Sequence, residues 1–348
     1  MISSDKFLDV EYLAPDELTE CRARGWPDVL GVALFCADDA PLDSGAVPVA
    51  RVRTRPLREQ AAVCEVWRTT GPFTSGTLGL VQYRTNRHFA FGRVALSEAG
   101  LTSGADDGRG LGSVSERAYT EVFRCLAALG FAHIIRIWNF LPEINREAGG
   151  LERYRQFNEG RQRAFKSFRG TLNGNVPAAC ALGSPPGSAL VVYFLAGTEE
   201  GTAIESPRQI PAYQYPPQYG AYSPTFSRAT LTQAATGPML FVSGTASIVG
   251  HQTVHVGDVI AQARETVANI RALVGEANRI VGEPLFALER LQYKTYLRRP
   301  TDIGIAVSEL EQALKPAAPI VYLNADVCRS DLLVEIEAVS FGGRPGAH

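Results

Sequence analysis

The hydrophobic and polar positions of residues 332–340 predict a β-strand that carries two carboxylates on one face. The stretch reads Leu-Leu-Val-Glu-Ile-Glu-Ala-Val-Ser, with the alternation and β-branched content of a half-buried strand. Because successive side chains point to opposite faces of a strand, Glu335 and Glu337 share a face with Leu333 and Val339. Ionised glutamate is rarely buried without a partner, so an ordinary strand would leave this face in solvent.

The order of the predicted elements is the same in the two halves of the chain. Each half has a strand with a glycine at mid-length, then a helix, a strand, a second helix and a closing strand. The strands are expected at 87–96, 134–140 and 190–195, then at 239–248, 288–297 and 332–340. The helices are expected at 113–129 and 151–168, then at 259–274, between an Asp258 cap and Gly275, and at 305–314. Further strands are expected at 29–35, 63–68 and 77–82. This internal repeat predicts two units, residues 1–200 and 201–348.

The two copies differ in their closing strands. Leu190-Val-Val-Tyr193 aligns with Leu332-Leu-Val-Glu335, so the first copy has an aromatic residue where the second has a carboxylate. An exchange of this kind is unexpected on a merely solvated face. It indicates a site at the junction of the copies that uses Glu335 once.

Residues 207–228 are rich in proline and tyrosine. Such a segment cannot be a helix or a central strand, because proline lacks the amide hydrogen that both require. Two interpretations remain open. The segment is an ordered loop that lines a site with Tyr213, Tyr215, Tyr219 and Tyr222, or it is a packed connection between the units.

Arg161 lies on the core-facing stripe of the helix at 151–168, together with Tyr154 and Phe157. A guanidinium on that stripe needs an anion, because a buried charge without a partner is costly. The partner is expected to be either a ligand carboxylate or an internal glutamate.

The composition favours a small-molecule ligand. A formal net charge of -2 with a pI near 6.3 gives no basic footprint for nucleic acid or for an anionic membrane. No apolar run approaches the roughly 20 residues of a membrane span, and the N-terminus lacks the regions of a signal peptide, so a cytoplasmic protein is expected.

The cysteines and histidines do not predict a disulfide framework or a metal site. The six cysteines include no close pair, which fits reduced thiols. His251 and His255 are four residues apart, but the residues around them predict a turn and a strand, where this spacing does not converge on a metal.

Three segments resemble the YjgF-like (reactive-imine deaminase) fold: Phe241-Val-Ser-Gly-Thr-Ala, Ala261-Gln-Ala-Arg-Glu-Thr-Val-Ala-Asn-Ile-Arg-Ala-Leu and Val334-Glu-Ile-Glu-Ala-Val. The resemblance implies an α+β fold of mostly antiparallel sheets, each with helices packed on one face, and sites between neighbouring copies. Glu335 matches the acidic residue of that family's closing strand. The family's carboxylate-binding arginine is absent, because this chain has Pro319-Ile-Val-Tyr322 there, and this argues against imine hydrolysis.

Nearly the whole chain resembles the chorismatase family, a duplicated form of that fold. The residues that carry the resemblance are Tyr83-Arg-Thr-Asn-Arg87, Ile137-Trp-Asn-Phe-Leu-Pro-Glu-Ile-Asn145, Tyr154-Arg-Gln-Phe-Asn-Glu-Gly-Arg161, the Pro/Tyr segment through Arg228, and residues 328–335. The resemblance implies cofactor-free removal of the enolpyruvyl side chain of chorismate as pyruvate. The ring product is then a dihydroxycyclohexadiene carboxylate or a hydroxybenzoate, the 3-isomer with or without some 4-isomer.

The residues suit this chemistry. Chorismate is a dianion with a flat ring, so it needs cationic groups and phenolic walls, for which the candidates are Arg161, Arg228, Tyr213, Tyr215 and Tyr154. Cleavage of an enol ether begins with protonation, and Glu335 is the candidate general acid, since burial and a nearby dianion both raise a carboxyl pKa.

Cys328 is the candidate for the choice of product. Within the family, a cysteine at the position that it resembles goes with 3-hydroxybenzoate formation. The alternative is that Cys328 is only a small buried hydrophobic residue.

A different class of function is also open, a non-catalytic module that binds a small acid. Glu335 in only one copy argues for the enzyme. The repeat further predicts that one chain supplies both sides of the site, so a monomer is expected to be active.

Overall fold

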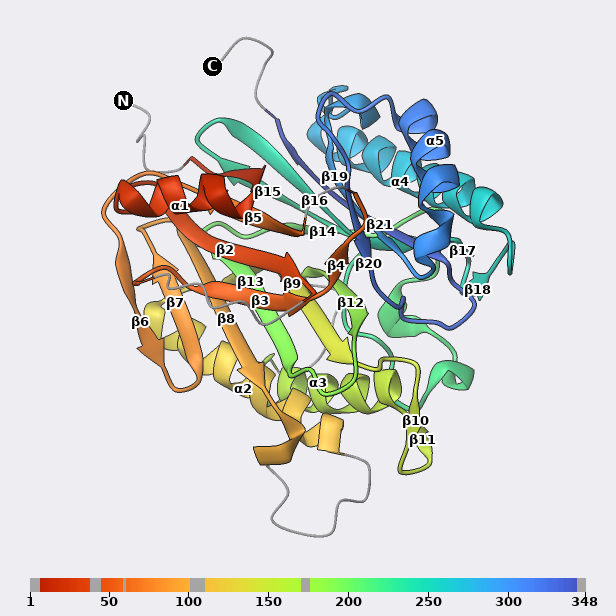
Figure 1. Cartoon of the computed structure of the whole chain (residues 1–348), viewed down its shortest axis with the longest axis horizontal. Helices are drawn as coiled ribbons and strands as arrows, with labels where there is room; N and C mark the ends of the chain where they lie inside the picture. The colour runs from red at the N-terminus through yellow and green to blue at the C-terminus, as the bar shows by residue number, and fades with distance from the viewer. Residues whose placement is uncertain (1–6, 38–44, 59–60, 101–109, 170–175, 343–348) are drawn as a thin grey trace.

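The computed structural model describes residues 7–37, 45–58, 61–100, 110–169 and 176–342, which form three large β-sheets with helices on their outer sides (Figure 1). The helices lie at the periphery in three places: α1 (Pro15–Ala23), α2 (Gly110–Leu129) with α3 (Arg153–Arg169), and α4 (Val259–Val281) with α5 (Ile303–Leu314). The inner faces of the sheets therefore meet one another in the centre of the molecule.

The strands of each sheet come mainly from one stretch of the chain. The first sheet has the order β1 (Asp9–Leu13), β5 (Ala62–Arg68), β2 (Val29–Cys36), β3 (Val49–Arg53). The second has the order β12 (Ala178–Ser184), β9 (His133–Pro142), β13 (Leu190–Gly197), β8 (Phe89–Leu96), β7 (Val81–Thr85), β6 (Thr74–Leu78). The third has the order β14 (Thr202–Ile204), β15 (Ala229–Ala234), β16 (Gly237–Ala246), β21 (Val334–Phe341), β19 (Gln292–Leu297), β20 (Val321–Asn324), β4 (Arg55–Pro56).

Short elements complete the fold. There are two small hairpins, β10 (Glu147–Ala148) with β11 (Leu151–Glu152) and β17 (Ile248–Val249) with β18 (Gln252–Thr253). The 3-10 turns are η2 (Glu98–Gly100), η3 (Ala212–Gln214), η4 (Pro217–Tyr219), η5 (Leu288–Arg290) and η6 (Pro300–Asp302).

The same strand order occurs three times. In each sheet the closing strand (β5, β13 or β21) pairs antiparallel with both the first strand (β1, β8 or β16) and the second (β2, β9 or β19), and the third strand (β3, β12 or β20) runs parallel to the second. The α+β prediction with a repeated unit is confirmed. The structure adds a smaller first unit within residues 9–68, which has one helix where the others have two. We retain the division near residue 200 as a proposal, consistent with the end of β13 and the start of β14.

Several predicted boundaries were wrong. The strand expected at 288–297 begins only at Gln292, because Leu288–Arg290 form the 3-10 turn η5. The predicted strand at 77–82 is a hairpin of β6 and β7, which turns at Gly79 with a φ of 57°. The helix that Asp258 caps does not stop at Gly275 and continues as α4 to Gly282, where the left-handed φ of 87° ends it. A single interior glycine costs only about 1 kcal/mol in a helix, and the buried Ala277 beyond it favours continuation. The Asp258 cap itself is confirmed, because its carboxylate accepts a hydrogen bond of 3.0 Å from the backbone amide of Ala261.

The central core is aromatic and is shared by all three sheets. Its largest members are Phe35, Trp67, Phe89, Phe91, Trp138, Phe140, Tyr193, Phe241 and Tyr296. The ring of Tyr193 stacks on that of Trp138 with 4.6 Å between centroids. The outer face of each sheet instead packs on its own helices. The three units are therefore held together through the inner faces of their sheets.

A buried cluster of charges lies inside this aromatic core. The ammonium of Lys294 on β19 pairs with Glu65 on β5 and, at 2.7 Å, with Glu337 on β21. Arg136 on β9 pairs with the second oxygen of Glu337. Tyr296 donates a hydrogen bond of 2.9 Å to the same carboxylate. Although burial alone would raise it, Lys294 and Arg136 hold the pKa of Glu337 below its usual value.

This cluster decides between the two interpretations of the closing strand and corrects the alignment of Tyr193. Glu335 and Glu337 are 3% and 5% exposed, so their shared face is buried and not solvated. Tyr193 corresponds to Glu337 and not to Glu335, because its hydroxyl lies 3.4 Å from the same Lys294 ammonium. The predicted alignment was therefore shifted by two residues.

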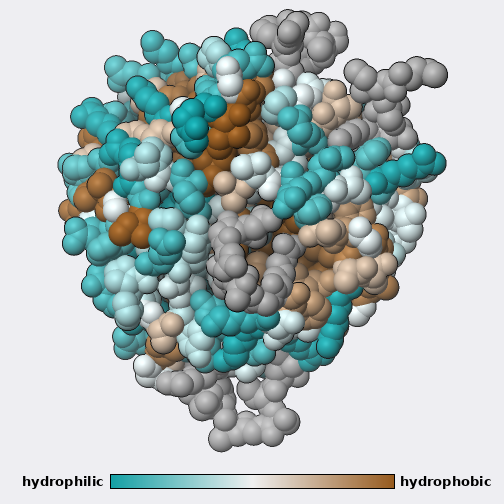
Figure 2. All heavy atoms as spheres, turned by 180° about the vertical axis from the view of Figure 1, so that it is seen from behind, coloured by the Kyte–Doolittle hydropathy of each residue, from teal (hydrophilic) through white to brown (hydrophobic). Residues whose placement is uncertain are grey.

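The face of the molecule opposite to that in Figure 1 carries both hydrophilic and hydrophobic residues. Figure 2 shows the face opposite to that of Figure 1, where hydrophilic residues cover most of the area and hydrophobic residues gather mainly near the top and on the right. Within the described part of the chain, no helix has the length and apolar character that a membrane span requires.

We predict that Lys294→Met destabilises the protein by about 3–5 kcal/mol, because it leaves two buried carboxylates without their ammonium partner. The measurement is the free energy of unfolding in urea. The control is Arg264→Ala, which removes an exposed pair with Glu309 and should leave the free energy of unfolding nearly unchanged. Equal losses for the two variants would show that the cluster does not stabilise the fold.

Candidate active site

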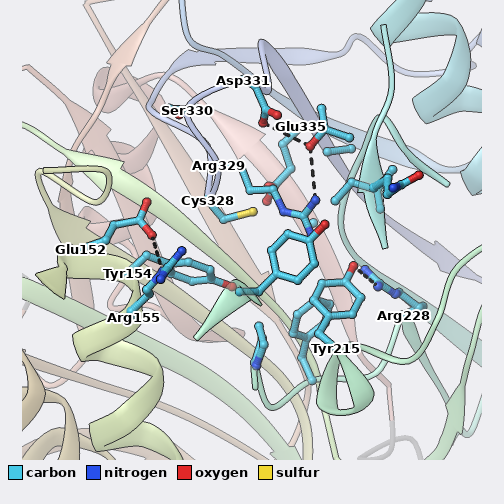
Figure 3. Close-up of a pocket in the computed structure, with 18 residues that line it drawn as sticks. Glu152, Tyr154, Arg155, Tyr215, Arg228, Cys328, Arg329, Ser330, Asp331 and Glu335 are labelled. Atoms are coloured by element: carbon cyan, nitrogen blue, oxygen red, sulfur yellow. Dashed lines mark hydrogen bonds and ion pairs between the residues drawn. The ribbon is translucent and has the colours of Figure 1, made fainter. Parts of the chain in front are cut away.

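The cavity of interest has a volume of about 650 Å³ and lies between the second and third units. The second unit contributes the start of α3, and the third unit contributes β16, β21 and the loop that precedes β21 (Figure 3). The residues with polar or charged side chains on its wall are Glu152, Tyr154, Arg155, Tyr215, Tyr219, Arg228, Gln252, Thr253, Cys328, Arg329, Ser330, Asp331 and Glu335.

Glu335 is a carboxylic acid at pH 7 in this environment. Burial, and then the negative charge of Glu337, raise its pKa from 4.5 to about 8. Its Oε1 atom is buried and has no hydrogen-bond partner among the described residues. The two glutamates on this strand face thus have opposite protonation states. Glu337 is ionised because two cations pair with it, whereas Glu335 has no such partner and is protonated.

Gly244 on β16 provides the space for this carboxyl group. A methyl group on Gly244 would lie 2.0 Å from Oε1 of Glu335, which is too close for any real contact. The ladder between β16 and β21 is irregular between Val242 and Thr245, so the backbone of β16 bends at this point. The glycine expected at the middle of this strand is therefore required by the close approach of Glu335.

Two guanidinium groups on the cavity wall retain unused donors. Arg228 is 3% exposed and donates to the hydroxyl of Tyr215 at 2.7 Å, but its Nε has no partner among the described residues. Arg329 lies over the ring of Tyr219 at 4.2 Å and donates to the carbonyl of His251 at 2.9 Å. Its Nη2 is likewise buried without a partner in the described chain. These donors can bind anionic oxygens.

The opposite side of the cavity carries a further cation and a phenol. Arg155 pairs with Glu152 at 3.4 Å, and Tyr154 lies beside them (Figure 3). Burial raises the pKa of Tyr154, so its hydroxyl stays protonated at neutral pH. Phenolic and cationic groups therefore face each other across the space.

The side chain of Cys328 projects towards this space beside Arg329 (Figure 3). Burial, and then the charge of Glu335, raise the pKa of its thiol to about 12. A thiol with this pKa is not ionised at neutral pH, so it is a poor nucleophile. Its contribution is the apolar, weakly hydrogen-bonding surface that it presents.

Most of the residues expected from the sequence meet in this cavity. Glu335, Cys328, Arg228, Tyr215 and Tyr154 all line it. Of the Pro/Tyr segment, Tyr219 lines it as well, so the interpretation of this segment as a loop at a site fits the structure.

Arg161 and Tyr213 are not on the cavity wall. Arg161 is buried in α3, where it donates to the amide oxygen of Asn158 at 2.7 Å and lies 4.8 Å from the Phe157 ring centroid. Asn158 is an amide and not the expected carboxylate, and the Nε of Arg161 is buried with no hydrogen-bond partner among the described residues. Tyr213 lies in η3 and is partly exposed.

Sequence reasoning missed Arg155 and Arg329. Both are next to residues that the sequence did single out, Tyr154 and Cys328. Charged residues at these positions have no pattern that separates them from a solvated surface, and only the fold brings them to the same cavity.

No group of three or more histidine, cysteine, aspartate or glutamate side chains that could hold a metal ion occurs among the residues that the structure describes.

The fold and the cavity define an α+β protein of repeated units, with a cavity walled by cationic, phenolic and carboxyl groups at the junction of two units. A family model described as "Chorismatase FkbO/Hyg5-like, N-terminal" matches residues 65–196. The 3-hydroxybenzoate synthase of Streptomyces hygroscopicus is 36% identical over 335 residues, which cover 91% of this chain and 94% of that protein. A chorismatase of Streptomyces rapamycinicus is 35% identical over 288 residues, 81% of this chain and 83% of that protein.

A solved structure agrees with the sequence relatives. The crystal structure of a chorismatase superposes with a TM-score of 0.84 at 29% identity, and the match covers 97% of this chain and 99% of that one. This chain belongs to the chorismatase family.

We predict that the stability conferred by Glu335 falls as the pH rises. Because its pKa is about 8 in the folded protein and 4.5 ordinarily, folding favours the protonated form. The contribution is complete below about pH 4.5 and is lost towards about pH 8, with a limiting slope of about 1.4 kcal/mol per pH unit for one proton. The measurement is the free energy of unfolding of wild type minus that of Glu335→Gln at several pH values.

The control for this measurement is Glu276→Gln. The exposed Glu276 has its pKa lowered by Arg279 and does not titrate between about pH 5 and about pH 8. The difference between wild type and this control should stay constant there. A constant difference for Glu335→Gln as well would show that the carboxyl of Glu335 is ionised at neutral pH.

Proposed function

We propose that this protein cleaves the enolpyruvyl side chain of chorismate and releases pyruvate and 3-hydroxybenzoate. The observation that carries the proposal is the carboxyl group of Glu335, which is buried, protonated and on the wall of a cavity with unused guanidinium donors. The names of the relatives, 3-hydroxybenzoate synthase and chorismatase, support the substrate and the product.

The first step is protonation of the substrate by Glu335. The proton passes to the terminal methylene carbon of the enol ether, which becomes a methyl group, and the positive charge develops on the adjacent carbon and ether oxygen. A general acid needs a pKa near the working pH, and the raised pKa of Glu335 meets this condition. The ionised Glu337 cannot take this role, because Lys294 and Arg136 hold it as a carboxylate.

The second step decides the ring product. The neighbouring ring hydroxyl attacks the ring carbon that bears the ether, the carbon–oxygen bond breaks, and its electron pair leaves with pyruvate. The hydroxyl proton passes to the carboxylate that the first step leaves on Glu335, which restores the acid. The resulting arene oxide opens to the aromatic acid. Attack by water in place of the hydroxyl would give the dihydroxycyclohexadiene carboxylate.

Binding is assigned to the cations on the wall. Arg228 and Arg329 are the candidates for the two substrate carboxylates, because both retain buried donors among the described residues. Tyr215, held by Arg228 at 2.7 Å, and Tyr154 form the phenolic walls. One chain supplies every one of these groups, so we propose that a monomer is active.

The first test is Glu335→Gln, assayed by the release of pyruvate from chorismate. The amide fills the same space but has no transferable proton, so the rate should fall by at least about 10²- to 10⁴-fold. Chorismate binding, measured by calorimetry, should persist and shows that the cavity is intact. Pyruvate release near the wild-type rate would contradict the assignment of Glu335. Binding of chorismate by the wild type with no pyruvate at all would favour the non-catalytic module.

The second test is Cys328→Ala, assayed by chromatography of the ring products. Loss of the sulfur atom leaves space beside the ring, and a water molecule occupies roughly 30 Å³ in the liquid. Pyruvate should still form, because protonation precedes the branch, while the ring product should shift from 3-hydroxybenzoate towards the diol. Cys125→Ala, in the core between α2 and its sheet, is the matched control and should not change the product ratio. An unchanged ratio in both variants would limit Cys328 to packing.

A further inference from the structure

A second large cavity lies between the first and third units. Its volume is about 830 Å³, within the range of small-molecule sites. It is lined by β1, β5 and the segment around β4 from the first unit, and by β19 and β20 from the third. Its lining residues include Val10, Tyr12, Arg58, Val63, Ile320 and Tyr322.

This cavity occupies the same position in the repeat as the candidate active site. At the active site, Leu182 on β12 of one unit pairs antiparallel with Val327, just ahead of the closing strand β21 of the next unit. At the second cavity, Leu323 on β20 pairs antiparallel with Pro56, just ahead of the closing strand β5. Both cavities therefore lie where the third strand of one unit meets the closing strand of another.

The register of the closing strands identifies the counterpart of Glu335. Glu337 and Glu65 both pair with Lys294, so they lie at the same level of their strands. Glu335 is two residues before Glu337, and Val63 is two residues before Glu65. Both Glu335 and Val63 also lie opposite an aromatic residue of the neighbouring second strand, Tyr296 or Phe35. The second cavity thus has a valine in the place of the acid, and it can bind a ligand without protonating it.

The walls of the second cavity define the kind of ligand. Val10, Val63 and Ile320 are apolar and suit a flat ring. Tyr322 is 2% exposed, and its hydroxyl is buried with no hydrogen-bond partner among the described residues. A buried hydroxyl without a hydrogen-bond partner costs free energy. A polar group of a ligand that binds the Tyr322 hydroxyl would remove this cost.

A cation and an anion lie at the edge of the cavity. The guanidinium carbon of Arg58 is 5.2 Å from the centroid of the Tyr322 ring, and Arg58 pairs with Glu311 at 2.6 Å. Both side chains of this pair are about half exposed, so the pair contributes little and Arg58 can exchange Glu311 for a ligand carboxylate. The anion, Glu11, is already paired with Arg68 at 2.8 Å.

We infer that the second cavity is a binding site for an aromatic monocarboxylate. The ring lies against Val10, Val63 and Ile320, the carboxylate is bound by Arg58, and a hydroxyl substituent reaches Tyr322. This inference goes beyond the proposed reaction, since it concerns a different junction of the fold and requires no turnover.

The experiment is equilibrium dialysis of the full chain with 3-hydroxybenzoate, which carries all three features. The wild type should bind two equivalents. Arg58→Ala should weaken one of them at least tenfold and leave the other unchanged, whereas Arg228→Ala should weaken only the other. Tyr322→Phe should weaken the same equivalent as Arg58→Ala, without loss of thermal stability. Arg264→Ala, which removes another exposed arginine paired with a glutamate, is the matched control and should bind like the wild type.

A single equivalent in the wild type, abolished by Arg228→Ala and untouched by Arg58→Ala, would overturn the inference. Two equivalents that respond to neither Arg58→Ala nor Tyr322→Phe would overturn it as well. Failure of the proposed function is distinguishable, because it is seen as absence of pyruvate from chorismate with the wild type, whatever the stoichiometry of 3-hydroxybenzoate binding.

Discussion

The buried ammonium of Lys294 is the interaction on which the rest of the structure depends. It lies between Glu65 of the first unit and Glu337 of the third, while Arg136 of the second unit neutralises the other side of Glu337. Each member is almost fully buried, so the removal of one charge leaves another uncompensated in an apolar surrounding. Apolar faces alone would allow the three sheets to slide or rotate, whereas paired charges on three different units fix one arrangement.

The same cluster sets the chemistry of the site next to it. Glu337 is held as a carboxylate, and burial of Glu335, then the negative charge of Glu337, raise the pKa of Glu335 and keep a proton on it. The protonation state of Glu335 therefore depends on Lys294 and Arg136, neither of which lines the cavity. The ionised Glu337 is stable in the core because Lys294 and Arg136 of the central cluster pair with it.

The sequence predicted the features that depend on neighbouring residues, and it did not predict those that depend on residues far apart in the chain. Hydrophobic periodicity revealed the repeated order of strands and helices, and the alternation of residues 332–340 placed Glu335 and Glu337 on one face. The first unit escaped notice because it lacks the second helix of the repeat. The partners of Glu337 are 41 to 201 positions away in the sequence, so no local pattern could show that this face is buried.

The same distinction applies to the residues of the candidate site. Glu335, Cys328, Arg228 and Tyr215 were found because they lie in recognisable motifs, whereas Arg329 and Arg155 reach the cavity only through the packing of two units. The binding role predicted for Arg161 stays a prediction. Its position on a core-facing stripe correctly predicted burial, but periodicity does not say which polar groups will pair with a buried guanidinium, and here Asn158 accepts from one Nη while Nε has no partner among the described residues.

The repeat of three units in one polypeptide has a consequence for the way such a protein can change. In a ring of identical subunits a single substitution appears at every interface, so no interface can be altered alone. In this chain the equivalent positions are encoded separately, and one junction holds Glu335 while another holds Val63. Each junction is thus exposed to selection by itself, and a residue that would be harmful at three places can be acquired at one.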